Sequence, residues 1–289
     1  MKSRMHPPVN TKDPSAVARE AQATYQALFP DGDPLFVSRV FGWAVDAFTG
    51  RYRDYQPIDA RYHDLEHTMQ GTLCMIRLLR GRQAAGAAPH LPQTMFELGL
   101  LAILLHDTGY LKLRGDTDGT GAKYTAIHVH RSAEFARQLL TEKGFAETDI
   151  RAVQHMIRCT GVDTELNVIP FQSDEERVAG FALGTADLLG QMAAGDYVEK
   201  LPILYSEFSE AAKHPTGAKA RVSAFTSAED LIAKTPAFWE KYVLVKIERD
   251  FGGLFRFLND PYPDGPNPYL QRIEANVARV RAAAPAPAA

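Results

Sequence analysis

Cysteine is scarce in this 289-residue chain, which has only Cys74 and Cys159. The two lie far apart in apolar, helical-looking segments, and no short spacing of the zinc-binding kind joins them. A chain of this length buries most of its unfolded surface and needs no disulfide to hold a core. We therefore expect free, buried thiols in a reducing compartment, and the cytoplasm is the expected location.

The sequence also lacks the features of membrane proteins, secreted proteins and nucleic-acid-binding proteins. No apolar run reaches the roughly 18 residues that a membrane-spanning helix requires. Residues 1–13 are polar with two prolines, unlike a signal peptide. The formal net charge of -3 gives no electrostatic footprint for nucleic acid, although local cations can still hold a small anionic substrate. We expect neither a membrane nor a nucleic-acid partner.

Helical spacing of apolar residues dominates the chain, and few segments alternate with period two, so the predicted class is all-α. Ser15 is the expected N-cap of the first helix, and a break is expected near Pro236 in the ninth. The predicted helices cover residues 15–29, 35–49, 61–81, 97–110, 124–144, 147–160, 174–193, 201–213, 227–258 and 270–282.

The most apolar stretch runs from Glu97 to Lys112. Residues 98–105 are apolar on every helical face, which predicts a helix buried at the centre of the domain. His106 and Asp107 end this run. Burying an imidazole beside a carboxylate is costly unless it is compensated, and a bound cation uses both residue types. The alternative to a metal site is a core histidine with satisfied hydrogen bonds, followed by an aspartate at the helix end. A metal site would need further ligands from other parts of the chain.

Other candidate ligands stand on separate predicted helices. His63 and His67 are four residues apart, so a helix would present both on one face, one turn apart. That spacing suits two metal ligands, or one ligand and a proton donor. The remaining candidates lie further along the chain: His128, His130, His155 and Asp187.

The order of these residues resembles the HD-domain superfamily of metal-dependent phosphohydrolases over roughly residues 60–195. The segment Arg61-Tyr-His-Asp-Leu-Glu-His67 is similar to the Tyr-His-Asn-x-x-His signature of the cyclic-nucleotide phosphodiesterases in that superfamily. The resemblance implies a compact helical bundle with a central metal site, and it implies that His63 is the proton donor to the leaving group. The ligands that it implies for the first metal are His67, His106, Asp107 and Asp187.

The resemblance also divides the chain. It implies a metal-binding catalytic core at residues 56–200. A disordered arm at residues 1–14 and a helical extension at residues 15–55 precede the core, and the extension is expected to pack on it. Helices within residues 201–282 complete the same domain, and residues 283–289 form a frayed tail.

Two features depart from the phosphodiesterase pattern. Those enzymes carry a histidine three residues after the Asp of the pair, whereas this chain has Tyr110. In contrast, residues 127–134 are similar to a His-x-x-x-Gly/Ser helix start of other superfamily members, in which the histidine binds a second metal. This similarity selects His128 rather than His130. His155 is the expected second partner, with helix packing or support of a ligand as its alternative roles.

The implied donor set, with both nitrogen and oxygen, suits Zn, Mn, Fe or Co better than Mg or Ca, at one or two ions per chain. Asp107 can bridge two metals. A bound water of lowered pKa would be the nucleophile, and protonated His63 would give its proton to the departing alkoxide. The expected substrate is a phosphate ester of a nucleotide or another small molecule, cleaved as a phosphodiester or a phosphomonoester.

Several residues near the motifs are candidate ligands for the substrate phosphate: Tyr110, Lys112, Arg114, Lys123, Arg131 and Arg158. For each lysine and arginine in this set, the alternative is a solvated position on the protein surface. The activity has alternatives as well. One is a di-iron oxygenase that cleaves a C–C or C–P bond with a six-ligand set that adds His128 and His155. The other is a non-catalytic metal-binding sensor or scaffold. The oligomeric state stays open, with a homodimer possible in principle.

Overall fold

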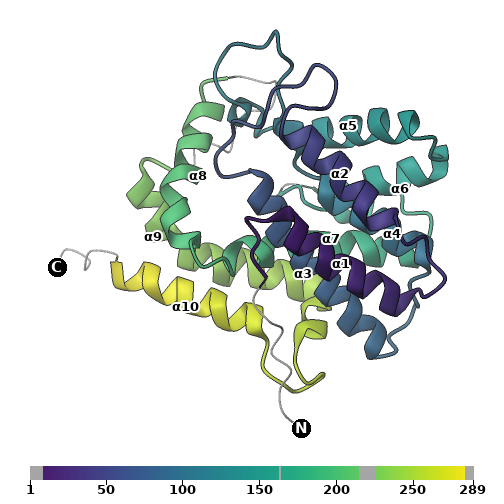
Figure 1. Ribbon diagram of the computed structural model, residues 1–289. Coiled ribbons are helices and arrows are strands. Elements are labelled where there is room, and N and C mark those ends of the chain that lie inside the picture. Colours follow the sequence, from purple (N-terminus) through teal and green to yellow (C-terminus); the bar gives the residue numbers. More distant parts are fainter. Residues whose placement is uncertain (1–8, 163, 215–224, 284–289) are drawn as a thin grey trace.

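The computed structural model describes residues 9–162, 164–214 and 225–283 (Figure 1). Within these ranges it is helical, with two isolated β-bridges and no strand, so the predicted all-α class is confirmed. Its α-helices are α1 Pro14–Leu28, α2 Phe36–Phe48, α3 Leu65–Ala84, α4 Gln93–Leu105, α5 His128–Glu142, α6 Glu147–Arg158, α7 Asp174–Met192, α8 Tyr197–Ala211, α9 Ala228–Phe238 and α10 Pro268–Ala283. None of the described helices is both long and apolar enough to cross a bilayer.

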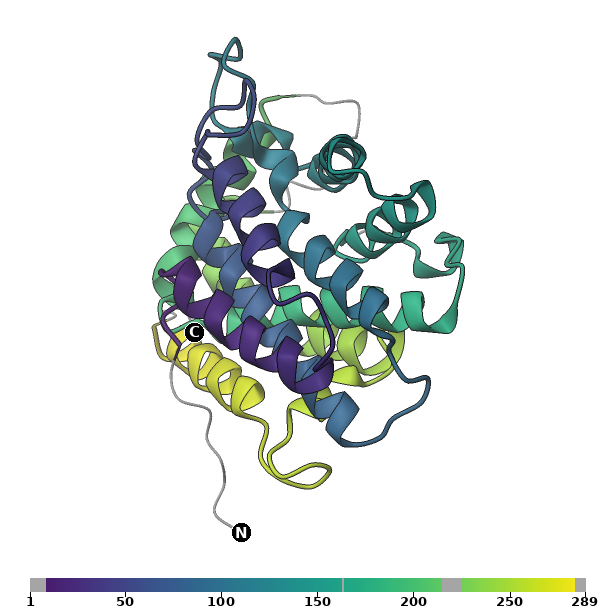
Figure 2. The same ribbon diagram turned by 45° about the vertical axis from the view of Figure 1, so that its right-hand side comes forward.

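Helix α4 lies at the centre, as its all-round apolar surface predicts. Every residue from Leu98 to Leu105 is buried, and α4 contacts α2, α3, α5, α6 and α7. Figures 1 and 2 show how the other helices surround it. Helices α1 and α2 cover one side, α5 and α6 lie together on another, α8 and α9 stand at the far end, and α10 runs along the bottom.

The first helix begins earlier than predicted. Its N-cap is Asp13, whose carboxylate accepts a hydrogen bond from the Ser15 amide at 2.9 Å, and Pro14 occupies the first helical position. The prediction of Ser15 as N-cap was therefore wrong. Residues 1–8 of the expected arm and residues 284–289 of the expected tail lie outside the described residues. Val9 packs against the core, so the described end of the arm is folded onto the domain.

Helix α3 also begins at a different place, and this changes the position of His63. The Asp64 side chain accepts a hydrogen bond from the His67 amide at 2.9 Å, which makes Asp64 the N-cap and Leu65 the first helical residue. His63 therefore precedes the helix, and the prediction that His63 and His67 share one helical face was wrong. Asp64, a good capping residue directly before Leu65, was the available signal.

Pro236 does not break the helix that contains it. Helix α9 passes through Pro236 and continues through two π-helical turns, Trp239–Val243 and Lys246–Asp250. A proline removes only one backbone donor, and the wider turns keep the chain helical beyond it. This continuous segment packs on α8 and α10 and closes one end of the bundle.

A close crossing of α3 and α7 positions two of the predicted ligands. A Cβ built on Gly190 of α7 would lie 2.8 Å from backbone atoms of Gln70 and Gly71 in α3, so the two backbones touch there. A Cβ on Gly71 would lie 3.8 Å from the Cα of Asp187. His67 lies one turn before Gly71 and Asp187 lies three residues before Gly190. The crossing therefore brings these two side chains to the same place in the core.

We predict that Gly190→Ala lowers stability by about 1–3 kcal/mol, because its methyl group would overlap rigid backbone. The free energy of unfolding from urea titration is the measurement. Gly42→Ala is the matched control, since Gly42 lies on the exposed face of α2 with no atom within 4 Å of the new Cβ. The control substitution is expected to raise the free energy of unfolding by about 0.4–1 kcal/mol. Equal stability of Gly190→Ala and the wild type would contradict the close crossing.

Candidate metal centre and its pocket

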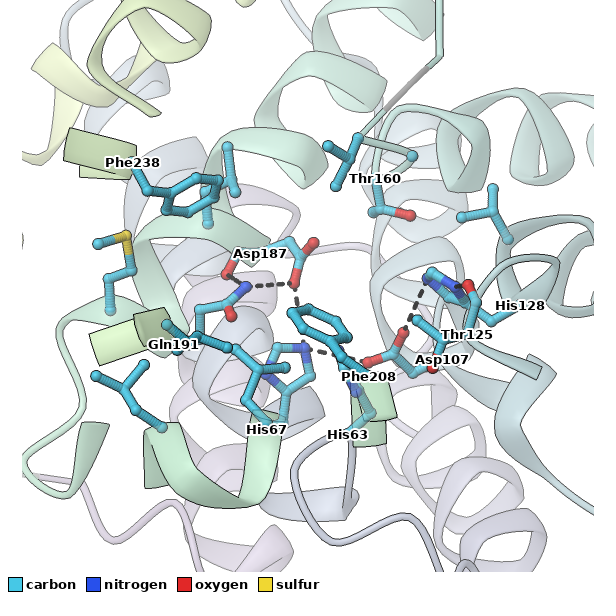
Figure 3. Close-up of a pocket in the computed structure, with 18 of the residues that line it drawn as sticks. His63, His67, Asp107, Thr125, His128, Thr160, Asp187, Gln191, Phe208 and Phe238 are labelled. Carbon is cyan, nitrogen blue, oxygen red and sulfur yellow. Dashed lines mark hydrogen bonds and ion pairs between the residues drawn. The ribbon is translucent and has the colours of Figure 1, made fainter. Parts of the chain in front are cut away.

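Four buried side chains converge in the core: His67 of α3, His106 and Asp107 at the end of α4, and Asp187 of α7. Figure 3 shows three of them, His67, Asp107 and Asp187. The Nε2 of His67 lies 3.1 Å from Asp107 Oδ2 and 3.2 Å from Asp187 Oδ1. The Nε2 of His106 lies 3.3 Å and 3.4 Å from the same two oxygens. Two imidazole nitrogens and two carboxylate oxygens thus face one point.

His106 is oriented as a metal ligand would be. Its Nδ1 donates to the Ile103 carbonyl at 2.7 Å, which directs Nε2 into the cluster. Both His106 Nε2 and Asp107 Oδ2 are buried without a hydrogen-bond partner, which is costly unless another group satisfies them. The candidate donor atoms of His67, His106 and Asp107 lie within 4.8 Å of one another. This buried cluster could therefore hold a metal ion.

The pKa values show how strongly the cluster is coupled. Burial lowers the pKa of the His67 imidazole, but Asp107 and Asp187 outweigh burial and raise it to about 10. The pKa of His106 is raised against burial by the same two carboxylates. Burial raises the pKa of each carboxyl group, but the two histidines outweigh it and hold both pKa values below their usual range. Anionic carboxylates and protonated imidazoles therefore stabilise each other here.

Asp107 also faces a third histidine. Its Oδ1 lies 3.9 Å from Nε2 of His128, while Nδ1 of His128 donates to the Thr125 carbonyl at 2.6 Å. Burial lowers the pKa of His128. His130, two residues later, is exposed. Asp107 thus presents one oxygen to the four-residue cluster and the other to His128, as a bridging carboxylate would.

His155 has different neighbours. Its Nδ1 lies 2.7 Å from the buried Glu176 carboxylate, and its ring packs edge-on against Phe171. Among the described residues, no ion pair joins His155 to Asp107 or Asp187. The structure therefore pairs His155 with Glu176, an acid that the sequence did not single out.

His63 lies beside the cluster although it precedes α3. Its ring centroid is 5.4 Å from that of His67, and it stacks on Tyr110 at 4.5 Å. Tyr110 also stacks on His128 at 4.7 Å. The centroids of His63 and His128 are themselves 6.1 Å apart, so the three rings form one compact group in which Tyr110 contacts both imidazoles.

Glu207 of α8 holds His63 from the opposite side. One carboxylate oxygen lies 2.6 Å from His63 Nδ1, and the other accepts a hydrogen bond from the Tyr62 amide at 2.7 Å. Burial raises the pKa of Glu207, but His63 outweighs burial and lowers it, so the carboxylate is ionised beside the imidazole. Sequence reasoning missed Glu207, because nothing in the spacing of the chain connects α8 to the segment before α3.

Gln191 was missed for the same reason. Its Oε1 accepts a hydrogen bond from the Tyr62 hydroxyl at 2.9 Å, and its Nε2 donates to the Asp187 carbonyl at 3.1 Å. Both ends of this amide are thus engaged in holding Tyr62 and Asp187 in place. The only available signal was the position of Gln191, four residues after the candidate ligand Asp187 on the same helix.

The cluster opens into a pocket of about 590 Å³, a size typical of small-molecule sites. His67, Asp107 and Asp187 form its buried inner part, with His63 and His128 beside them (Figure 3). The remaining wall comes mainly from α7, α8 and α9. The cluster is therefore accessible to a ligand.

The basic residues expected at the substrate phosphate lie outside the lining of this pocket: Lys112, Arg114, Lys123, Arg131 and Arg158. Lys112 lies 2.9 Å from Asp59, and Lys123 pairs with Asp116. Arg131 donates to two backbone carbonyls in the turn after Asp107. Arg158 is exposed on α6. The contacts of Lys112, Lys123 and Arg131 brace residues 108–124, whereas Tyr110 does line the pocket.

We predict that His106→Ala and Asp107→Ala each lower metal affinity by at least about tenfold, while far-UV circular dichroism keeps its helical amplitude. Elemental analysis of anaerobically purified protein is the measurement. His130→Ala, with its exposed side chain, is the control and should retain the metal content of the wild type. Full metal content in both cluster variants would refute the assignment.

The raised pKa of His67 predicts how metal affinity depends on pH. Below its pKa of about 10 the imidazole holds a proton that a metal ion must displace. Affinity should therefore rise with pH by about tenfold per unit for each proton displaced. Calorimetric titration with Co²⁺ in buffers of different ionisation enthalpy counts the protons released. An affinity that is constant between about pH 6 and about pH 9 would contradict this coupling.

One match to a known family covers most of the chain. Searches of curated proteins and of solved structures gave no match. The model of a family described as Npun_R2479-like matches residues 40–256, a range that contains all the residues of the candidate metal centre. Because this match spans well over half of the sequence, the chain belongs to the Npun_R2479-like family.

Proposed function

We propose that this protein is a metal-dependent phosphoric ester hydrolase of the HD-domain superfamily. The observation that carries the proposal is the convergence of His67, His106, Asp107 and Asp187. All of these except His106 line the inner end of a pocket. The sequence resemblance names the same four as ligands of a single metal. They come from three helices that are distant along the chain, so their meeting is not a consequence of local sequence.

The donor set favours a transition metal. Two imidazoles and two carboxylates suit Zn, Mn, Fe or Co, whereas Mg and Ca prefer oxygen ligands alone. His128, which faces the second oxygen of Asp107, is the residue that best supports a second ion. A divalent ion bound at such a site lowers the pKa of water and polarises a phosphoryl group.

His63 is the proton donor in this proposal. Glu207 engages its Nδ1, which leaves Nε2 as the nitrogen that can deliver a proton to a leaving oxygen in the pocket. The ionised Glu207 holds the imidazole through Nδ1, and the Tyr110 ring stacks on its face. A positioned general acid of this kind typically contributes about 10²–10⁴ in rate.

The di-iron oxygenase is the second candidate, and one observation favours it. A carboxylate on Nδ1 of a histidine often supports metal binding through Nε2, and Glu176 pairs with His155 in that way. That reaction would need His155 as a sixth ligand, but no ion pair joins His155 to Asp107 or Asp187 in the described structure. We therefore rank hydrolysis first. A non-catalytic sensor ranks last, because the implied first-metal ligands meet beside a pocket.

The first experiment combines metal analysis with an assay. Anaerobically purified protein is analysed for Zn, Mn, Fe, Co and Ni, and then tested on bis(4-nitrophenyl) phosphate. We expect transition metal together with phosphodiester cleavage that a chelator abolishes. Asp187→Asn serves as the inactive control. Iron without cleavage would move the assignment to the oxygenase, and protein without metal would leave a non-catalytic scaffold.

We predict that His63→Ala keeps its metal and loses about 10²-fold or more in kcat for esters of phenol, whose oxygen needs a proton as it leaves. Esters of 4-nitrophenol, a much better leaving group, should lose far less. Comparison of kcat for the two esters tests the role of His63, with His130→Ala as the control. An equal loss for both esters would remove the general-acid role.

A further inference from the structure

The outer part of the pocket differs sharply from its inner part. Beyond the cluster, the wall formed by α7, α8 and α9 is largely hydrocarbon, as shown by these lining residues: Leu188, Leu201, Leu204, Phe208, Leu231 and Phe238. Figure 3 shows Phe208 in front of the cluster and Phe238 across the pocket from it. Phe208 also stacks on Phe225 at 5.9 Å, which holds its ring in place. A ligand that reaches the cluster must therefore lie against an apolar surface.

The lining offers little positive charge. Lys234 is the one lysine or arginine among the described residues of the lining, and its Nζ is paired with Asp230 at 2.9 Å. Asp107 and Asp187 contribute two carboxylates. A di- or triphosphate carries more negative charge than a metal centre and one paired lysine can compensate. The pocket therefore suits a ligand with a single phosphate group.

Specific recognition of a nucleobase also finds little support. The amide of Gln191, which is the one Asn or Gln among the described lining residues, has both ends engaged by Tyr62 and Asp187. Two threonine hydroxyls of the lining, those of Thr160 and Thr235, donate to carbonyls of their own helical turns. This amide and these two hydroxyls are thus already engaged, while the Tyr110 hydroxyl of the lining is buried without a hydrogen-bond partner.

The mouth of the pocket is apolar as well. Val162 and Phe238 line the pocket and are 59% and 38% exposed. Tyr242 stacks on Phe238 at 5.1 Å and donates its hydroxyl to the Val162 carbonyl at 3.1 Å, so the rim is a built structure. Exposed hydrocarbon that continues into a pocket marks the route of an apolar group.

We propose that the natural substrate is an amphiphilic phosphate monoester or diester with one phosphate, whose head lies at the metal centre and whose hydrocarbon body lies against α8 and α9. This inference rests on the proposed hydrolase for the identity of the head. It rests on the pocket alone for the hydrocarbon body. The volume of about 590 Å³ accommodates a ligand of drug-like size.

The test uses a series of 4-nitrophenyl alkyl phosphates with methyl, butyl and octyl chains, assayed with the metal-loaded full chain. We expect kcat/KM to rise by about two- to fourfold per added methylene until the pocket is filled. Phe208→Ala should flatten this dependence. Phe238→Ala, at the exposed mouth, is a second variant that leaves the core intact. Leu35→Ala removes an exposed leucine outside the pocket and should keep the slope of the wild type.

A binding series separates this inference from the proposed function. Methyl-, butyl- and octylphosphonic acids, which are not cleaved, are titrated calorimetrically into the same protein. Cleavage with a flat chain-length dependence would overturn the amphiphilic substrate and leave the hydrolase. Affinity that rises steeply with chain length, without cleavage of any ester, would support the apolar pocket and overturn the hydrolase. Absence of both cleavage and chain-length dependence would overturn both.

Discussion

The arrangement of this protein depends on the cost of burying two imidazoles and two carboxylates in one core. Each group alone would be strongly unfavourable there, so each must face a group of opposite character. His67 and His106 each contact Asp107 and Asp187, and the surrounding structure holds these side chains at that distance. The glycine contact between α3 and α7 and the apolar helix α4 serve this one requirement.

A second set of contacts prepares the inner pocket for chemistry. Glu207 and Tyr110 fix His63, while Gln191 and Tyr62 fix the backbone beside Asp187. In the part of the outer pocket that the structure describes there is no comparable polar network, and the wall is mostly hydrocarbon. The pocket therefore has two different ends. At the inner end, hydrogen bonds fix the positions of the polar side chains. At the outer end, an apolar wall selects a ligand mainly by its size and hydrophobicity.

Helical spacing predicted the fold class, and the all-apolar run at residues 98–105 predicted the central helix. Polar side chains that interrupt apolar helices need partners, which marked the candidates, and the resemblance to the HD-domain superfamily selected the four clustered residues among them. Glu207 and Gln191 could not be found, since their contacts with His63 and Tyr62 join α8 and α7 to the segment before α3, and no local pattern records such a contact. His63 was expected on α3, but the capping carboxylate of Asp64 starts the helix after it. Lys112 and Lys123 were expected at a ligand, yet nearby aspartates bind them.

The spread of the cluster along the chain has a consequence for the life of the protein in a cell. Its members extend from residue 67 to residue 187, on helices that meet only in the folded chain. An ion bound there would link three helices and close a long loop of the chain. It would therefore stabilise the folded core, in addition to any role in chemistry. Scarcity of the metal would then lower the amount of the protein in the cell through faster degradation, in addition to lowering its kcat.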